Sequence, residues 1–287
     1  MNPSDQSYVV PESWKQDIIE IVSLSIKEDI KDGDITAQLI PKNKQMKTAV
    51  ITREHAVLCG KDWVNETFSQ IDPTITITWF YNDGNLITPN DVLFTAEGNA
   101  RSILSAERIA LNFLQLLSGT ATTCRQYSDT ISHTTTSILD TRKTIPGLRT
   151  AQKYASLCGN CHNHRIGLYD AFLIKENHIA ACGSIIQAVN TARSNHPSKP
   201  IEVETETLNE VKQALQAKAD RIMLDDFSIE DIRKAVELCQ GKCELEVSSN
   251  VTLDTLQQIA ETGVDFISSG ALTKHCKAID LSMRFTT

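Results

Sequence analysis

The second half of the chain alternates short apolar runs with amphipathic helical stretches, and this alternation restricts the fold more than any other feature. Helical patterns such as residues 208–217 and 253–261 separate the later runs. Strands joined through helices pair in parallel, because a right-handed crossover returns the chain to the same edge of the sheet. The pattern predicts a parallel α/β sheet or barrel. The expected strands are residues 137–139, 172–174, 201–203, 222–224, 244–247 and 266–268.

The first hundred residues lack this repeat, and they predict a separate unit of mixed helix and strand. Residues 18–26 carry an apolar stripe at helical spacing. Residues 74–80 alternate as a strand does, and residues 82–84 then predict a hairpin turn. We expect a long buried helix over residues 103–117 that ends at Gly119.

Length, charge and cysteine content exclude several classes of protein. The 287 residues suffice for about two domains with large apolar cores. The net charge of −8 argues against a general nucleic-acid binder, which needs a basic face. No stretch reaches the roughly 18 apolar residues of a membrane span, and the polar N-terminus does not resemble a secretion signal. We therefore expect the eight cysteines to be reduced thiols in a cytoplasmic protein.

A polar residue or glycine follows each expected strand at nearly the same phase. The last four of these residues are separated by 21, 23 and 22 positions, one strand–helix unit each. In α/β barrels the substrate site lies at the carboxyl ends of the strands. We expect one shared site, although polar residues also begin wherever a strand simply ends. The six residues are Lys143, Lys175, Glu204, Asp225, Ser248 and Gly270.

Residues 139–178 are locally basic in an acidic chain. Six lysines and arginines there stand against three carboxylates, which gives the segment a charge of +3. Arginine binds carboxylates through two parallel hydrogen bonds, and lysine acts as a point charge on phosphate. We expect a ligand with several carboxylates or phosphates; the competing interpretation is a solvated surface. The cations are Arg142, Lys143, Arg149, Lys153, Arg165 and Lys175.

Two carboxylates and two loops complete this pattern. If Glu204 and Asp225 faced a polyphosphate, they would hold Mg²⁺, which prefers oxygen ligands. They are also candidates for a general acid or base, or for offsetting the neighbouring cations. Residues 248–250 and 268–271 each join a strand to a helix. Main-chain N–H groups at such helix starts bind phosphate.

Residues 158–162 read Cys-Gly-Asn-Cys-His, which fits the haem-attachment pattern. Covalent haem attachment requires export, and the sequence carries no export signal. A thiol redox role and a zinc site that includes His164 are further alternatives. The zinc interpretation lacks a second pair of ligands at a distance in the sequence. We expect a structural loop.

Three segments are more specific than these general patterns: residues 140–149, 163–168 and 173–178. They closely resemble the quinolinate phosphoribosyltransferase family, and the resemblance extends from about Glu28 to Phe285. Shorter matches to the family lie at residues 106–108, 202–204, 224–225 and 270–273.

The resemblance implies an N-terminal α/β open sandwich domain over residues 1–115 and an incomplete parallel α/β barrel over residues 116–273. The tail, residues 274–287, is expected to return to the first domain. The implied reaction joins quinolinate to phosphoribosyl pyrophosphate with Mg²⁺, giving nicotinate mononucleotide, pyrophosphate and CO₂ in de novo NAD biosynthesis. A homodimer or higher oligomer with shared active sites is expected, with no nucleic-acid or membrane partner.

The resemblance also implies roles for individual residues. Lys143 is expected between quinolinate and the sugar phosphate, and Arg101 is expected to come from the partner chain. Glu204 and Asp225 are expected near the ribose and the metal-bound pyrophosphate, and with Lys143 they are the expected catalytic residues. The quinolinate carboxylates are expected to meet Arg142, His164, Arg165 and Lys175. The phosphate loops are expected to include Ser248, Ser249, Asn250 and Gly270.

The chain departs from the family pattern at a few positions. Asn160 and Cys161 stand where the family usually has glycines. Ser249 stands where glycine is common, and Asp226 where asparagine is common. These changes bear on affinity more than on the reaction.

Three other functions stay open. A paralogue of the same fold, such as the molybdenum-transport-associated relatives, would act on another carboxylated base. A Schiff-base lyase would use Lys143 or Lys175 at a strand end, and borohydride would trap its intermediate. A binding module for small polyanions would bind them without releasing pyrophosphate.

Overall fold

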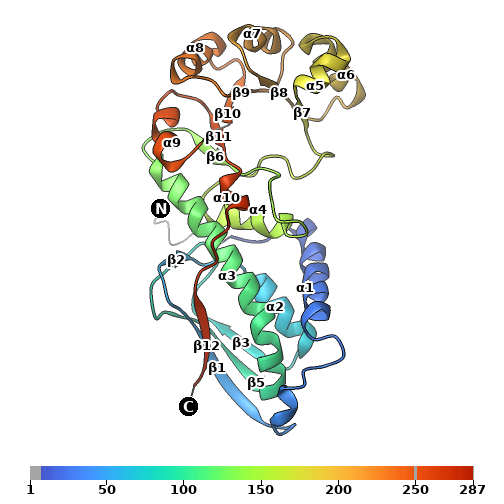
Figure 1. The fold of residues 1–287 in the computed structure, drawn as a ribbon, viewed down its shortest axis with the longest axis vertical. Helices are drawn as coiled ribbons and strands as arrows, with labels where there is room; N and C mark the ends of the chain where they lie inside the picture. The colour runs from blue at the N-terminus through green and yellow to red at the C-terminus, as the bar shows by residue number, and fades with distance from the viewer. Residues whose placement is uncertain (1–7, 249–250, 287) are drawn as a thin grey trace. The chain divides into compact units, whose positions relative to one another are not determined.

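The computed structural model describes residues 8–248 and 251–286. The chain forms two compact units that alternate along the sequence. The first unit takes the chain up to Arg125, residues 144–160 and the chain from Leu272 onward, and the second takes residues 126–143 and 161–271. Both units combine helices and strands (Figure 1), which confirms the predicted α/β class.

The first unit is built on a four-stranded antiparallel sheet in the order β12-β1-β5-β3. The C-terminal strand β12 pairs with β1, with Leu281 opposite Thr52 and Phe285 opposite Thr48. A separate two-stranded sheet joins β2 to β4. The strands are β1 (Gln45–Thr52), β2 (Ala56–Val57), β3 (Thr76–Trp79), β4 (Leu86–Ile87), β5 (Val92–Asn99) and β12 (Leu281–Phe285).

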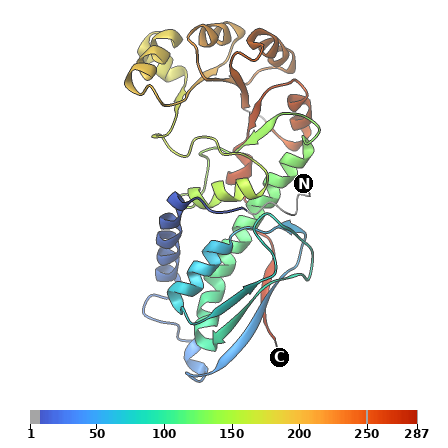
Figure 2. The ribbon, with the colours of Figure 1, turned by 180° about the vertical axis from the view of Figure 1, so that it is seen from behind.

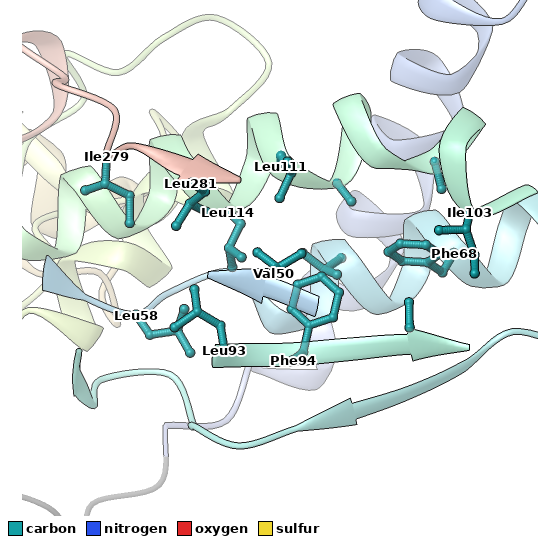
Figure 3. Packing of buried hydrophobic residues seen from close by; sticks show 14 of the residues in the cluster. Val50, Leu58, Phe68, Leu93, Phe94, Ile103, Leu111, Leu114, Ile279 and Leu281 are labelled. Carbon is teal, nitrogen blue, oxygen red and sulfur yellow. The ribbon is translucent and has the colours of Figure 1, made fainter. Parts of the chain in front are cut away.

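Apolar side chains fill the space between this sheet and the long helix α3, Ala100–Thr130 (Figure 3). Leu111 and Leu114 of α3 cluster with Val50 and Phe94 of the sheet. Burial of apolar surface is the main favourable term in folding, so this cluster holds the unit together. The unit's other helices are η2 (Glu12–Trp14), α1 (Lys15–Asp29), η3 (Ala37–Leu39), α2 (Lys61–Ile71) and α4 (Arg149–Cys158); α10 (Ala271–Lys274) begins at the boundary with the second unit.

The predicted end of the long helix at Gly119 is wrong, because α3 continues to Thr130. A Cβ atom at position 119 would lie 2.0 Å from the main-chain oxygen of Lys277. The glycine therefore allows the returning C-terminal segment to pass close to the helix. α3 also runs through residues 115 and 116, where the resemblance implies a domain boundary.

The predicted hairpin at residues 82–84 is also wrong. β3 pairs with β5 whereas β4 pairs with β2, so the strands on either side of the turn belong to different sheets. Asp83 is buried, and its Oδ1 accepts hydrogen bonds from the N–H groups of Gly60 at 3.0 Å and Lys61 at 3.3 Å. Tyr154 of α4 donates to Asp83 Oδ2 at 2.9 Å. Asp83 therefore connects the start of α2 to α4 inside the first unit.

The second unit is a six-stranded parallel sheet in the order β6-β11-β10-β9-β8-β7. The sheet curves (Figure 2), and β6 and β7 at its two ends are not paired with each other in the described part of the chain. The predicted incomplete parallel barrel is confirmed, and every expected strand is present. The strands are β6 (Ser137–Leu139), β7 (Phe172–Ile174), β8 (Ile201–Thr205), β9 (Arg221–Asp225), β10 (Glu244–Ser248) and β11 (Phe266–Ser268).

The connecting helices of this unit lie along the outer side of the curved sheet (Figures 1 and 2). Thr207, Ser228 and Thr252 cap three of them, each accepting a hydrogen bond from a main-chain N–H in the first turn. Since side chains alternate along a strand, the set that does not face the helices faces the interior of the barrel. The helices are α5 (Glu176–Cys182), α6 (Ile185–Asn195), α7 (Leu208–Gln216), α8 (Ile229–Cys239) and α9 (Leu253–Ala260).

Candidate active site

A cavity of about 340 Å³ lies in the second unit, at the carboxyl-terminal half of its strands. The structure brings seven of the predicted site residues together in its lining: Arg142, Lys143, His164, Arg165, Lys175, Glu204 and Ser248. The remaining lining residues are Thr141, Leu173, Met223, Glu246 and Ser268.

The register of the parallel strands arranges the interior side chains of β8, β9 and β10 in rows. Side chains two residues apart on a strand point to the same face, so the rows share one face of the sheet. Asp225 and Ser248 at the carboxyl ends are strand-end residues that the sequence predicts. In the other rows Glu202, Met223 and Glu246 are buried, whereas Glu244 at the amino end of β10 is exposed. From the amino ends to the carboxyl ends, the rows are Glu202–Arg221–Glu244, Glu204–Met223–Glu246 and Asp225–Ser248.

Two arginine side chains face the cavity close enough to affect each other. Burial lowers the pKa of Arg165, and the positive charge of Arg142 lowers it further. Arg165 Nη1 donates a hydrogen bond to the main-chain oxygen of Ala171 at 3.2 Å. Because like charges held together repel, an anion bound between them lowers their electrostatic energy. The pair is suited to a carboxylate or a phosphate.

Lys143 is positioned by its neighbours on two loops. Its main-chain N–H donates to Thr141 Oγ1 at 3.0 Å. A Cβ atom on Gly270 would lie 2.7 Å from Lys143 Cδ. Gly270 therefore leaves the room that the lysine side chain needs beside the cavity.

Glu204 and Asp225 come from neighbouring strands, but only Glu204 lines the cavity. Glu204 Oε2 forms an ion pair with Lys175 Nζ. Asp225 ends β9 and is half-buried beside Ser248 in the strand register. Two carboxylates on adjacent strands offer the hard oxygen donors that Mg²⁺ prefers, so the donor set fits this ion.

A buried charged cluster forms the floor of the cavity. His164 Nε2 lies 2.8 Å from Glu202 Oε2 and 3.4 Å from Glu246 Oε2. Arg221 Nη1 lies 3.2 Å from Glu246 Oε2, and the Arg221 guanidinium stacks over Phe266 at 4.1 Å. Among the described residues, His164, Glu202 and Glu246 are the one group of three potential metal ligands.

Burial raises the pKa of both glutamates in this floor to about 7. The charge of Glu202 raises the pKa of Glu246 further, whereas the positive charge of Arg221 opposes the rise in both. Two buried carboxylates this close ionise together only when cations or hydrogen-bond donors compensate them. His164 and Arg221 supply that compensation.

Glu246 was not predicted from the sequence, and Glu202 was recognised only as part of the family-like segment 202–204. Both precede a predicted strand-end residue by two positions, Glu204 in β8 and Ser248 in β10. The two-residue period of a strand would have placed them on the same face as the site. Glutamates that alternate with apolar residues along β8 and β10 were the available signal.

Comparison with known proteins identifies the family. The quinolinate phosphoribosyl transferase N-terminal domain matches residues 34–118, and the C-terminal domain of the same family matches residues 120–284. The chain belongs to the quinolinate phosphoribosyltransferase family. A structure of the nicotinate-nucleotide pyrophosphorylase from Francisella tularensis is 51% identical, with a TM-score of 0.94, and the match covers 98% of this chain and 99% of that one.

Curated relatives of this family include proteins from Oryza sativa and Synechocystis. A chloroplastic nicotinate-nucleotide pyrophosphorylase [carboxylating] from Oryza sativa is 40% identical over 94% of this chain and 78% of its own length. A probable enzyme of the same name from Synechocystis is 41% identical over 90% of this chain and 89% of its own length. In the described part of this chain, no helix is both long and apolar enough to cross a membrane.

Some of the predicted residues do not line this cavity or fall outside the described residues. Arg101 belongs to the first unit, where its Nε donates to the main-chain oxygen of Ile40 at 2.7 Å. Arg149 and Lys153 of the basic segment belong to α4, also in the first unit. Ser249 and Asn250 lie outside the described residues.

Two departures from the family pattern have a backbone explanation. Asn160 and Asp226 adopt left-handed φ angles of 63° and 58°. Asparagine and aspartate tolerate this region better than other residues with a side chain, so they can replace glycine or each other there. Asn160 Oδ1 also accepts a hydrogen bond from the Tyr8 hydroxyl at 2.5 Å.

The cysteine motif is divided between the two units. Cys158 ends α4 and is buried, and a Cβ on Gly159 would lie 2.3 Å from Cys124 Cβ. Cys161 is buried in the second unit, and His162 forms a parallel bridge with Leu139 of β6. These residues are packing elements of the fold.

Proposed function

We propose that the chain transfers the phosphoribosyl group of phosphoribosyl pyrophosphate to quinolinate. The products are nicotinate mononucleotide, pyrophosphate and CO₂, in de novo NAD biosynthesis. The observation that carries this proposal is the convergence of Arg142, Lys143, Arg165 and Lys175 on one cavity in a chain of net charge −8. The proposal is supported by membership of the quinolinate phosphoribosyltransferase family and by relatives named nicotinate-nucleotide pyrophosphorylase.

The chemistry explains the need for fixed cations. The pyridine nitrogen attacks the anomeric carbon of the ribose as the bond to pyrophosphate breaks. The nitrogen then carries a positive charge, and the adjacent carboxylate leaves as CO₂ while its bonding electrons stay on the ring carbon, which takes a proton. The protein's task is to hold two polyanions together and to offset their charge.

We assign the quinolinate carboxylates to Arg142, Arg165 and Lys175, with His164 at the floor of the same cavity. Lys143, which Gly270 leaves room for, is assigned to the region between quinolinate and the sugar phosphate. Leu173 and Met223 supply the apolar lining on which a pyridine ring can pack. Ser248, with Ser249, Asn250 and Gly270, is assigned to the phosphates.

We assign a Mg²⁺ ion to Glu204 and Asp225, directly or through water. When bound, the ion would neutralise the pyrophosphate and favour its departure. The Lys175–Glu204 ion pair then has a second role, because it holds Glu204 oriented before substrates bind.

We further propose a cytoplasmic homodimer whose sites receive Arg101 from the partner chain. The eight cysteines are all free thiols, as a reducing compartment requires. Arg101 belongs to a different compact unit from the cavity and is held by main-chain oxygens rather than by a carboxylate.

The test is release of both pyrophosphate and CO₂ on mixing the protein with quinolinate, phosphoribosyl pyrophosphate and Mg²⁺. Quinolinate is expected to release both products, and nicotinate is expected to react little. Turnover of another carboxylated base alone would favour a paralogue. Binding of the substrates by a folded protein without release of pyrophosphate would favour a polyanion-binding module.

A further inference from the structure

The imidazole of His164 has a defined orientation at the cavity floor. Its Nδ1 accepts a hydrogen bond from the main-chain N–H of Arg165 at 2.8 Å. Only an unprotonated ring nitrogen accepts, so the hydrogen-bond pattern places the ring proton on Nε2. Nε2 lies within ion-pair distance of two buried carboxylates, 2.8 Å from Glu202 Oε2 and 3.4 Å from Glu246 Oε2, without the alignment of a hydrogen bond.

The backbone around His164 is held by two aspartates. The His164 N–H donates to Asp140 Oδ1 at 2.9 Å. After Arg165, the N–H groups of Ile166 and Gly167 donate to the Asp170 carboxylate at 2.7 and 3.2 Å. Arg165 therefore lies between two anchored points, and the ring of His164 makes the contact to its own N–H.

The two glutamates face the imidazole from different strands. Glu202 on β8 is 6% exposed and Glu246 on β10 is 0% exposed, so water does not replace them as partners. A carboxylate oxygen beside Nε2 attracts a proton on that nitrogen and repels a lone pair there, so the two glutamates favour the imidazole form that carries its proton on Nε2. Arg221 Nη1 donates a hydrogen bond to Glu246 Oε2, the oxygen nearest His164, at 3.2 Å.

We propose that Glu202 and Glu246 are positioning residues for the quinolinate site. They hold His164 in the tautomer whose Nδ1 accepts from the Arg165 N–H, and thereby fix where Arg165 enters the cavity. The expected change in the KM for quinolinate rests on the proposed function. The expected tautomer of His164 does not. Glu202 does not line the cavity, Glu246 belongs to its floor, and both contact Nε2 of His164, so they act through His164 and Arg165. Similar outer partners orient the histidines of metal sites.

The kinetic test replaces each glutamate by its amide, in Glu202→Gln and Glu246→Gln. The matched control is Glu244→Gln, because Glu244 lies on the same face of β10 and binds Arg221 at 2.9 Å but is exposed. Each test variant is expected to raise the KM for quinolinate about tenfold, with the KM for phosphoribosyl pyrophosphate and kcat changed less than about twofold. The control is expected to leave all three constants unchanged.

A spectroscopic measurement separates this role from general damage to the fold. Proteins labelled with ¹⁵N-histidine report which imidazole nitrogen carries the proton, and the His164 signals are identified by their loss in His164→Gln. The wild-type protein is expected to show the Nε2–H form at His164, and the two test variants are expected to lose that preference while Glu244→Gln keeps it.

Several results would overturn the proposal. These are a proton on Nδ1 in the wild-type protein, unchanged His164 signals in both test variants, and equal increases in both KM values. The first needs no variant, so it applies even if a substitution prevents folding. Absence of turnover with quinolinate in the wild-type protein would remove the proposed function, whereas the His164 signals would still decide the positioning role.

Discussion

The sheet face that packs on α3 in the first unit and the inner face of the sheet in the second unit have opposite character. In the first, the space between sheet and helix α3 is filled by apolar side chains, including Val50, Phe94 and Leu114 (Figure 3). In the second, the inner face of the parallel sheet carries Glu202, Arg221 and Glu246 in addition to the residues at the cavity.

The difference separates what stabilises a fold from what a site requires. Apolar burial contributes about 25 cal/mol for each Å² removed from water. A buried ion pair contributes little or even destabilises relative to apolar residues, because desolvation of the charges offsets their attraction. The charged residues on the inner face therefore add little to the stability of the fold. Their presence is better explained by the binding of a polyanionic ligand and by the need to orient the residues that bind it.

The largest effect on stability is expected in the apolar interior. Phe94 is fully buried against Trp79 and Phe68, with ring centroids 4.5 and 6.3 Å away. Phe94→Ala should lower the free energy of unfolding by about 3–5 kcal/mol, because it leaves a cavity. Chemical denaturation measures this. The folded variant should keep the wild-type KM for quinolinate. A large rise in that KM would show that the apolar core of the first unit also contributes to quinolinate binding.

The charged interior should show the reverse behaviour. Arg142→Ala removes a cavity cation, so the KM for quinolinate should rise about a hundredfold while the thermal midpoint changes little. The KM for phosphoribosyl pyrophosphate should rise much less. Steady-state kinetics with each substrate varied in turn gives both values. Equal losses for the two substrates would contradict the assignment of Arg142 to quinolinate.

Asp83 is a buried carboxyl group inside the first unit, and its effect should depend on pH. Burial raises its pKa from 3.8 to about 6. The folded state therefore holds the proton more tightly than the unfolded state, and this contribution to stability is present below pH 3.8 and is lost as pH rises through about 6.

The Asp83→Asn variant isolates this contribution. Between pH 7 and pH 5 the wild-type protein should gain about 1 kcal/mol of stability that the variant does not gain. Urea denaturation of both proteins at the two pH values gives the difference. A wild-type protein that instead lost stability relative to the variant on acidification would show that Asp83 is ionised and favourably paired.

The smallest effect on activity is expected at the cysteine motif. Cys158→Ser with Cys161→Ser should keep wild-type turnover, since both thiols are buried packing groups outside the cavity lining. Stability should fall by about 1–3 kcal/mol because two hydroxyls replace apolar contacts. Loss of turnover in a folded double variant would restore a functional role for the thiols.

The strands of the second unit could be predicted because each is a short apolar run bounded by polar residues. The cavity residues at strand ends, such as Lys175 and Glu204, could be predicted for the same reason. Gly119 could not be interpreted from sequence, since its role depends on Lys277 passing close by. Glu246 was missed because its partners, His164 and Arg221, are distant in the sequence and meet only in the folded sheet.

The central claim is that the second unit's cavity recognises two adjacent carboxylates through fixed cations. Calorimetric titration of the protein with quinolinate, and then with nicotinate, tests this most directly, because nicotinate lacks one of the two carboxylates. Quinolinate is predicted to bind about a hundredfold more tightly, and its affinity should fall as salt is added. Equal affinities for the two ligands, with no dependence on salt, would show that fixed cations in the cavity do not recognise the second carboxylate.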